Sequence, residues 1–425
     1  MITNTSNTKC FSQVSIVNGE ICDIILGSSR YMEYYMIKER NWNFIRGLDF
    51  GMVLALVLLL GASLLILSTA SINVMASDPY HYVKTQVVWI ATGIVLAVII
   101  AFTDYENYKK IGIWIYAFNI FLLLLVFAFG SEAKGAQRWI PITSTQSIQP
   151  SEFAKVLLIV TFASFLNERE GKLNNVKDFI LPLLFVLPPT LLIFLQPDLG
   201  TAMVFGAIFI GMMFAAGANP IKFGAVIVGC IGTAIGAVAL HLSTNLPGPL
   251  KFLEGLPLPL KDYQINRFIA FLDPAKDTSG DGYHVIQSVW AIGSGGIWGK
   301  GYQQGTQAQY NFLPEHHTDF IFSVVGEEFG FIGTSILLFV FCILLLRMIT
   351  VATKSRDRYG VLIVSGVVSM IVFHVFINVG MASGIMPVTG IPLPFITSGG
   401  SSMWANMLAV GLVLSVSLRG ERRMF

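Results

Sequence analysis

The hydrophobic residues of this chain are concentrated in about ten long stretches, which short polar segments separate. A helix that crosses a bilayer needs about 20 predominantly apolar residues. The candidate spans lie at about 49–69, 84–103, 110–129, 152–167, 178–195, 201–218, 220–241, 320–347, 358–383 and 403–418. The fourth is short and has charged residues near its start. The pattern predicts an all-α polytopic membrane protein with about ten transmembrane helices.

The composition agrees with this prediction and excludes other classes of protein. Of the 425 residues, 54% are hydrophobic and 12% are charged, whereas about 25% are charged in an average soluble protein. Too few charges remain to cover a surface in water, which excludes a soluble enzyme. The net charge of +2 provides no basic surface for nucleic acid. The four cysteines lie far apart and predict neither a disulfide framework nor a zinc site.

The distribution of lysine and arginine orients the predicted helices, because cytoplasmic loops carry an excess of both. With the N-terminus inside, the short cytoplasmic segments hold Lys38, Arg40, Arg46, Lys109, Lys110, Arg169, Lys172, Lys177, Lys222, Arg347, Lys354, Arg356, Arg358, Arg419, Arg422 and Arg423. The short outer segments hold Lys84, Lys134 and Arg138. This asymmetry predicts that both termini are cytoplasmic, and that a large outer segment separates the seventh helix from the eighth.

Two segments lie outside the predicted helices. Residues 1–45 are polar and lack the apolar core of a signal peptide, so we expect a cytoplasmic extension ahead of a membrane domain at 46–425. Because Met36 closely precedes the first helix, we hypothesise that residues 1–35 are dispensable. The outer segment at about 242–318 is much longer than an ordinary loop and keeps aromatic residues throughout, so we expect a folded outer cap.

Charged side chains at the ends of the predicted helices are candidates for function, because a charge within a bilayer is costly. Arg138 and Trp139 precede the fourth helix, and Glu152 and Lys155 lie three residues apart at its start. That spacing places the carboxylate and the ammonium group on one helix face. One interpretation is an ion pair that merely neutralises itself. The other is a binding site for an anionic headgroup such as a diphosphate, which two cations would suit.

A second group surrounds the start of the eighth helix, in the sequence LPEHHTDFIFSVVGEEFG. If the helix begins near Thr318, then Asp319 and Glu327 lie on one face, about two turns apart. The alternative makes Thr318 or Asp319 a helix N-cap. The adjacent histidines also allow a metal site, but neighbouring side chains on a helix point in different directions.

Further polar residues admit structural and functional interpretations. The turn QPDLGTA places Asp198 either in a site or at the cap of the next helix. His374 and Asn378, four residues apart in the ninth helix, are typical of hydrogen bonding between helices. The loop at 389–402 is rich in glycine, proline and small residues. Irregular backbone at membrane depth is tolerated where it is buried in protein or lines a cavity, so we expect this loop to border one.

These segments together resemble a known family. The motifs GAQRWI, QPSEFAK, QPDLGTA, RFIAFLDPAKDTSGDGYHVIQS, AIGSGGIWGKG, LPEHHTDFIFSVVGEEFGFIG and TGIPLPFITSGGSS are similar to those of the SEDS proteins (shape, elongation, division and sporulation), in the same order. The resemblance covers about residues 45–420. GTQAQYNFLPE and QPDLGTA resemble the members that act in elongation more than those that act in division. One departure is Thr397-Ser398, where the family often has Ser-Tyr.

The resemblance implies a peptidoglycan glycosyltransferase of the bacterial cytoplasmic membrane. Such proteins polymerise lipid II at the outer face of the membrane. They work with a class B penicillin-binding protein, which cross-links the strands, and with other membrane proteins of the elongation machinery. The family's essential carboxylate falls at Asp319, its acidic and basic pair at Glu152 and Lys155, and its arginine and tryptophan at Arg138 and Trp139.

We hypothesise that Asp319 is the general base that takes a proton from the 4-hydroxyl of incoming lipid II. The predicted substrate-binding residues are Arg138, Trp139, Glu152, Lys155, Arg267 and Glu327. Among them, Arg138 and Lys155 would hold the departing diphosphate, and Glu327 is the alternative base. The residues imply no established cofactor. A divalent cation could assist the diphosphate, but the sequence specifies no ligands for it.

Two other functions compete with the enzyme. The same cavity could flip lipid II across the membrane, as a transporter. Transporters often contain inverted repeats with broken helices near the midplane, and we find no such repeat in this sequence. The chain could also be a scaffold without activity, in which case the loss of Asp319 would do no harm.

Overall fold

The computed structural model describes residues 47–72, 78–133, 136–141, 147–242, 267, 270–274, 277, 280–310, 312 and 317–420. Within these, the chain from Asp49 onward belongs to one compact unit. The predicted extension at 1–45 lies outside the described residues, and so does part of the predicted outer cap, including residues 243–266.

The described residues are predominantly helical, as predicted. The α-helices are α2 (Phe50–Ala70), α3 (His81–Phe102), α4 (Tyr105–Lys110), α5 (Gly112–Phe129), α6 (Pro150–Asn167), α7 (Ile180–Leu195), α8 (Leu199–Ala215), α9 (Pro220–Leu242), α11 (Asp281–Gly295), α12 (Thr306–Gln309), α13 (Ile321–Thr353), α14 (Arg358–Ala382) and α15 (Gly400–Arg419), and η1 (Val176–Phe179) is a 3₁₀ helix. Three short strands, β1 (Ser131–Ala133), β2 (Ala136–Pro141) and β3 (Ser147–Ile148), form an antiparallel sheet in the order β1-β2-β3. This small sheet corrects the purely α-helical prediction.

Among the described residues, seven helical segments are long and apolar enough to cross a membrane: α2, α3, α5, η1 with α7, α13, α14 and α15. Each of them lies at a predicted span. The predicted sixth and seventh spans correspond to the shorter apolar segments Leu199–Ala215 and Pro220–Thr233, and the fourth corresponds to α6. The total of ten spans and the cytoplasmic position of both termini stay predictions.

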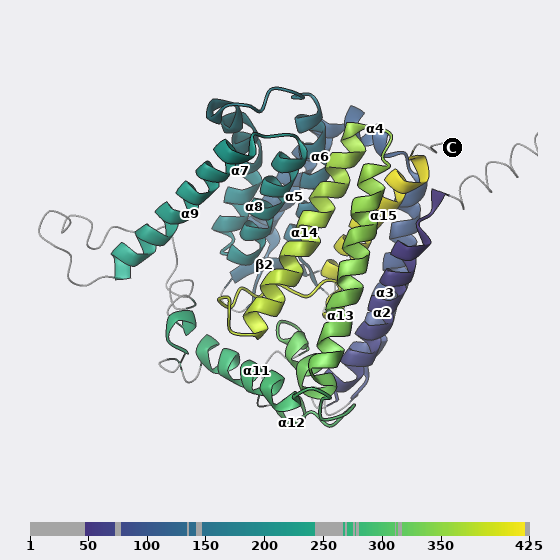
Figure 1. Ribbon diagram of the computed structural model, residues 1–425, viewed down its shortest axis with the longest axis vertical. Coiled ribbons are helices and arrows are strands. Elements are labelled where there is room, and N and C mark those ends of the chain that lie inside the picture. The colour runs from purple at the N-terminus through teal and green to yellow at the C-terminus, as the bar shows by residue number, and fades with distance from the viewer. Residues whose placement is uncertain are drawn as a thin grey trace, which may run out of the picture. The chain divides into compact units, whose positions relative to one another are not determined.

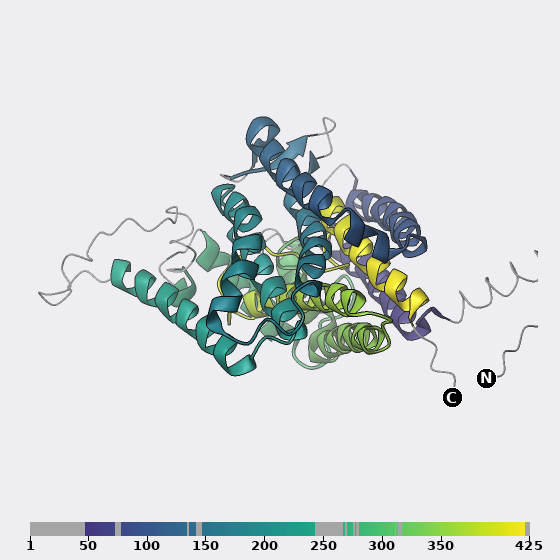
Figure 2. The same ribbon diagram turned by 90° about the horizontal axis from the view of Figure 1, so that it is seen from above.

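Helix α6 is the central helix of the bundle, and it packs against α5, α7, α8, α14 and α15 (Figure 1). Most of its side chains are buried, Glu152 and Lys155 included. Because other helices rather than lipid surround it, α6 can carry charged side chains in its first turns. By contrast, α9 extends away from the bundle, as both views show (Figure 2).

Helix α7 contains two consecutive prolines, Pro188 and Pro189. Proline has no backbone N–H, so the carbonyl group four residues earlier loses its partner in the helix. For Pro189 that carbonyl belongs to Phe185, and the hydroxyl of Tyr116 on α5 donates to it at 2.8 Å. A side chain of α5 therefore replaces the missing bond and joins the two helices.

Polar contacts join the helix ends around α4. Tyr105 is fully buried and donates to the Asp357 carboxylate at 2.7 Å. Burial and this hydrogen bond raise the pKa of the Tyr105 hydroxyl, which therefore remains the donor. Three arginines at the same end form ion pairs: Arg356 with Glu106 at 3.9 Å, Arg358 with Glu170 at 3.0 Å and Arg419 with Asp104 at 3.6 Å.

The described part of the predicted outer cap is folded against α13. Helix α11 lies across the end of the bundle opposite α4 (Figure 1). Helix α13 is broken at Gly330, whose φ and ψ are 64° and −161°. The loop after α11 pairs with this break through four hydrogen bonds, from Lys300 N to Glu327 O at 3.0 Å, Gly301 N to Glu328 O at 3.0 Å, Phe331 N to Gly296 O at 2.9 Å and Ile332 N to Ile297 O at 3.2 Å. The loop thus satisfies backbone groups that the break in α13 releases.

Glycine permits this close approach of two backbones. Gly299 has φ +80°, and a Cβ at this position would overlap the carbonyl oxygen of Glu328. Gly296 also has a positive φ of +57°, but no atom lies within 4 Å of its Cβ position. The positive φ therefore favours glycine at both positions. At Gly299 the close contact with α13 also leaves no space for a side chain.

We expect Gly299→Ala to destabilise the protein far more than Gly296→Ala. The second substitution adds only the strain of a backbone conformation that residues other than glycine rarely adopt, about 1–3 kcal/mol, whereas the first also forces the loop away from α13 and should cost at least about twice as much. Thermal unfolding of the purified variants in detergent measures both losses. Equal losses would show that the loop is not held against α13 through Gly299.

Candidate active site

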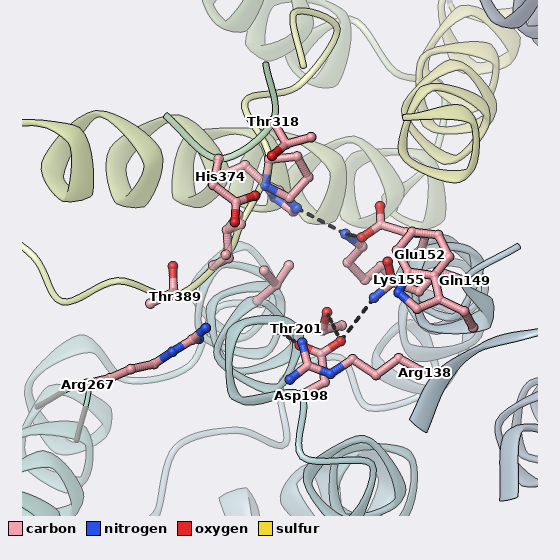
Figure 3. Close-up of a pocket in the computed structure, with 16 residues that line it drawn as sticks. Arg138, Gln149, Glu152, Lys155, Asp198, Thr201, Arg267, Thr318, His374 and Thr389 are labelled. Carbon is pink, nitrogen blue, oxygen red and sulfur yellow. Dashed lines mark hydrogen bonds and ion pairs between the residues drawn. The ribbon is translucent and has the colours of Figure 1, made fainter. Parts of the chain in front are cut away.

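A cavity of about 390 Å³ opens beside the start of α6. Its lining comes from β2, α6, α8, α14, the cap and the loops before α13 and α15 (Figure 3). The lining residues are Arg138, Trp139, Gln149, Glu152, Lys155, Asp198, Thr201, Val204, Arg267, Thr318, Asp319, His374, Thr389, Gly390, Ile391 and Pro392. The structure therefore brings together Asp319 and all the predicted substrate-binding residues except Glu327.

The charged pair on α6 lies inside the protein rather than at an exposed membrane edge. Pro150 occupies the first turn of α6, where its missing N–H costs no helical bond. Lys155 is 2% exposed and Glu152 is 4% exposed. The ammonium Nζ of Lys155 donates to Glu152 Oε1 at 2.9 Å. A buried ammonium group needs such partners, because an isolated buried charge is very costly.

His374 on α14 provides the second partner of Lys155. Its Nε2 lies 3.0 Å from Lys155 Nζ, and its Nδ1 lies 2.7 Å from the carbonyl oxygen of Met370. A neutral imidazole with its proton on Nδ1 fits both contacts, because Nδ1 then donates and Nε2 accepts. The interhelical hydrogen bonding expected of His374 is thus observed. The sequence did not reveal that the partner of His374 is Lys155.

The cavity wall opposite α14 is built around Asp198. This carboxylate caps α8 by accepting from Thr201 N at 3.1 Å, and it also accepts from Gln149 Nε2 at 3.1 Å. Arg138 Nη1 lies 3.7 Å from Asp198 Oδ1, and the Arg138 guanidinium also donates to the carbonyl oxygen of Pro197. The capping interpretation of the QPDLGTA turn is therefore confirmed, and the same carboxylate also lies beside a cation at the cavity.

Asp319 lies in the turn that precedes α13. The helix begins at Ile321, with Phe320 in the N-cap position and no capping bond from that side chain. The helix thus begins at the predicted span of 320–347 rather than near Thr318, and Asp319 is not the N-cap residue. Its Oδ2 lies 3.6 Å from the position that a Cβ of Gly390 would occupy. That distance is an ordinary van der Waals contact, so it is the positive φ of Gly390, +72°, that favours glycine here.

Asn378 and Thr397 hold the two loops beside Asp319 together. The side-chain amide of Asn378 donates to the carbonyl oxygens of Asp319 and Ile391, both at 2.9 Å. Thr397 Oγ1 accepts from Leu393 N at 2.9 Å and donates to Thr318 O at 3.3 Å. The loop at 389–402 therefore borders the cavity, as expected, and Thr397 is one of its structural supports.

Arg267 reaches the cavity from the cap, on the side opposite Arg138 (Figure 3). Its Nε lies 3.4 Å from Asp281 Oδ2 at the first turn of α11. With Lys155, three cationic side chains from separate segments of the chain therefore face one cavity. This arrangement suits a ligand that carries several negative charges.

Glu327 lies in a different cluster, where α12 meets α13. Its carboxylate is fully buried, and Lys300 Nζ, Thr306 Oγ1 and Gln307 N donate to it at 2.6, 3.0 and 3.0 Å. Helix α13 begins only at Ile321, so the predicted face shared by Asp319 and Glu327 does not form. Glu327 therefore joins α12 to α13 within the cap, and it does not line the cavity.

The described residues contain no group of three or more His, Cys, Asp or Glu side chains placed to bind a metal ion. His317 is described and packs its ring 4.7 Å from that of Tyr82, whereas the adjacent His316 lies outside the described residues. A divalent cation at the diphosphate stays a prediction.

The family model described as Cell cycle protein, which is named for FtsW, RodA and SpoVE, matches residues 49–422. The chain belongs to this family. Its relatives include the peptidoglycan glycosyltransferase MrdB of Escherichia coli (strain K12), which is 36% identical over 379 residues that cover 89% of this chain and 95% of the relative. The peptidoglycan glycosyltransferase RodA of Treponema pallidum (strain Nichols) is 36% identical over 434 residues, which cover 88% of this chain and 99% of the relative.

The fold of this FtsW/RodA/SpoVE family member is also found among solved structures. A chain of a peptidoglycan synthase complex, described for its structural coordination of polymerization and crosslinking, superposes with a TM-score of 0.70 at 31% identity. The alignment covers 87% of this chain and 97% of that chain. The cavity with its three cations therefore lies within the part of the chain that the family shares.

We expect Glu152→Gln to destabilise the protein by about 3–5 kcal/mol, because it leaves the buried Lys155 ammonium without its counterion. The double variant Glu152→Gln/Lys155→Met removes both charges and should recover most of that loss. Thermal unfolding in detergent of the wild type, both single variants and the double variant completes the cycle. Additive losses would contradict a direct pair inside the folded protein.

Proposed function

We propose that this protein is a peptidoglycan glycosyltransferase that polymerises lipid II at the outer face of the bacterial cytoplasmic membrane. The observation that carries the proposal is the single cavity in which Asp319 and three cations from separate segments meet. The relatives named as peptidoglycan glycosyltransferases align over nearly the whole chain, and this supports the same reaction here.

The cations match the charge of the substrate. Lipid II joins its sugar to the lipid through a diphosphate, which is a good leaving group and needs charge stabilisation more than a proton. Arg138 and Arg267 approach from opposite sides, and Lys155 lies at the start of α6 between β2 and α14. Preorganised cations in a protein cavity stabilise developing negative charge more than water does, because they need no reorientation during the reaction.

Asp319 supplies the base. It takes the proton of the 4-hydroxyl of incoming lipid II, and that oxygen forms a bond to the anomeric carbon of the growing strand. The bond from this carbon to the diphosphate breaks, and the lipid diphosphate leaves with the electron pair. Attack from the face opposite the leaving group inverts the α-linkage to a β-linkage in a single displacement. Asp319 borders the same cavity as the cations, so both ends of the displacement share one site.

The buried contacts of Lys155 fix its position. Its Nζ donates to Glu152 Oε1, and Nε2 of a neutral His374 accepts from it without adding a positive charge. Both partners lie on helices, which position a side chain more rigidly than loops do. Lys155 thus remains a fixed cation, while Arg138 and Arg267 approach from β2 and the cap.

The membrane arrangement and the partners belong to this proposal. Ten spans with both termini in the cytoplasm place the cavity on the outer side, where lipid II is polymerised. A class B penicillin-binding protein that cross-links the product is the proposed partner, supported by the similarity to a chain of a peptidoglycan synthase complex. The proposed role is in elongation, with division as the alternative. The test expresses this protein in cells that are depleted of their elongation member of the family. Restored rod shape supports the role in elongation, and restored division supports the alternative.

We expect Asp319→Asn to fold normally and to lower the rate of lipid II polymerisation at least about a hundredfold, because an amide cannot act as a base. Asp78→Asn is the matched control, since Asp78 is a carboxylate that pairs with exposed Lys84 away from the cavity. The measurement is polymer formed by purified protein from lipid II in liposomes. An active Asp319→Asn protein would remove Asp319 as the base, and translocation of lipid II without polymer would favour the flippase.

Lys155→Met should lower polymerisation about a hundredfold or more, because the departing diphosphate loses a fixed cation. Lys84→Met removes an exposed lysine of the outer side and should leave the rate unchanged. The same polymer assay measures both, with thermal unfolding as a check on folding. Wild-type polymerisation by Lys155→Met would exclude the diphosphate role. If the single variant loses its fold because Glu152 is left buried without its partner, the double variant Glu152→Gln/Lys155→Met is assayed instead.

A further inference from the structure

A second cavity, of about 280 Å³, lies at the α4 end of the bundle. It opens between the start of α5 and the ends of α4 and α6, with α7 behind. Its lining residues are Lys109, Lys110, Gly112, Ile113, Tyr116, Thr161, Ser164, Phe165, Glu168 and Phe185. No residue is shared with the cavity at Asp319. The proposed orientation places this second cavity on the cytoplasmic side.

The mouth of the cavity carries two adjacent cations, Lys109 and Lys110. Neither side chain forms an ion pair or a hydrogen bond within the part of the chain that the structure describes, whereas three arginines at the same end of the bundle are paired with carboxylates. Two neighbouring ammonium groups repel one another. An anion between them would offset that repulsion.

Inside the mouth, a buried hydroxyl group faces the cavity. Ser164 is 8% exposed, and its side chain forms no hydrogen bond to any residue that the structure describes. Its neighbour Thr161 instead donates to Leu157 O at 2.9 Å, as hydroxyls on helices commonly do. Gly112 stands opposite, and a Cβ there would lie 3.5 Å from Ser164 Oγ, which leaves the approach to the hydroxyl open. Ser164 is therefore an available donor inside a basic cavity.

The floor of the cavity is aromatic. The rings of Tyr116 and Phe165 each lie 4.5 Å from the ring of Phe185. The Tyr116 hydroxyl already donates to Phe185 O, so the floor presents ring carbon rather than a free donor. Beside the mouth, the side chains of Ile113 and Trp114 on α5 are 72% and 75% exposed. A ligand that enters here meets cations first and an apolar surface next to them.

We propose that this cavity binds the headgroup of an anionic phospholipid of the cytoplasmic leaflet. The phosphate lies between Lys109 and Lys110 and accepts a hydrogen bond from Ser164, and the acyl chains extend along the exposed surface of α5. Basic pockets between transmembrane helices on the cytoplasmic side are suited to such headgroups. Glu168 at the same mouth repels further negative charge and accepts hydrogen bonds from hydroxyl groups. The two lysines and Ser164 therefore favour a phosphodiester, and Glu168 favours a headgroup with hydroxyl groups, as in phosphatidylglycerol.

The test compares lipid binding by three variants of the full chain, purified in a neutral detergent and titrated with phosphatidylglycerol or phosphatidylcholine. Lys109→Gln/Lys110→Gln removes the two cations. Lys172→Gln/Lys177→Gln is the matched control, because both lysines are exposed at the same end of the bundle and do not line the cavity. Ser164→Leu fills the cavity without a change of charge. Bound lipid is counted by native mass spectrometry, and polymerisation is not the readout.

We expect phosphatidylglycerol to bind the wild type and the control pair, and to bind Lys109→Gln/Lys110→Gln roughly 30-fold more weakly. Ser164→Leu should also bind it weakly, and phosphatidylcholine should bind none of the proteins specifically. An equal loss in both lysine pairs would show non-specific attraction to a basic surface and overturn the proposal. Unchanged binding in all variants would overturn it as well.

A separate titration distinguishes the lipid from a soluble anion. Inorganic phosphate shares the chemistry of the headgroup but has no acyl chains. Phosphatidylglycerol should raise the thermal stability of the wild type in detergent, and inorganic phosphate at the same concentration should not. A shift of the same size with inorganic phosphate would overturn the lipid as the occupant. Because these readouts measure binding, they stand or fall independently of the proposed glycosyltransferase activity.

Discussion

The organisation of the cavity at Asp319 depends on one buried ammonium group. Lys155 lies on the central helix, and an isolated charge there would be too costly to retain. Glu152, one turn away, and His374, on a neighbouring helix, share its hydrogen bonds. This contact fixes α6 against α14 at the level of the cavity. The helices that carry the loops beside Asp319 are positioned by the same packing, so the cation and the carboxylate are part of one framework.

Around that framework, irregular backbone is tolerated because its polar groups are paired. The loop after α11 pairs with the break in α13 at Gly330, and Asn378 bonds two carbonyl groups of the loops at the cavity. In a continuous helix, the backbone N–H and C=O groups are paired within the helix itself. Here a loop that glycines allow to approach closely, or a side-chain amide, forms those hydrogen bonds instead. Glu327 belongs to this supporting structure, since its carboxylate binds the start of α12 to α13.

The two cavities use charge differently. At Asp319, each cation has a carboxylate near it, so an anionic substrate meets a site whose charges are already positioned. At the α4 end, Lys109 and Lys110 have no such partner among the described residues, and an exposed apolar surface lies beside them. Paired cations favour a defined geometry for chemistry, whereas unpaired cations at a membrane edge favour attraction of anionic lipid.

The sequence by itself determined the helical membrane architecture, because apolar stretches of about 20 residues permit little else. It also identified Arg138, Glu152, Lys155 and Asp319 as chemically unusual, and the resemblance to the family led to the roles proposed for them. Local pattern could not reveal the short sheet that presents Arg138, because its strands are only two to six residues long. Helical spacing also put Glu327 on one helix face with Asp319, about two turns away, because it assumes a continuous helix, whereas α13 begins only after Asp319. Only the tertiary structure decided that His374 contacts Lys155 and that Glu327 does not reach the cavity, because such contacts join residues far apart in the chain.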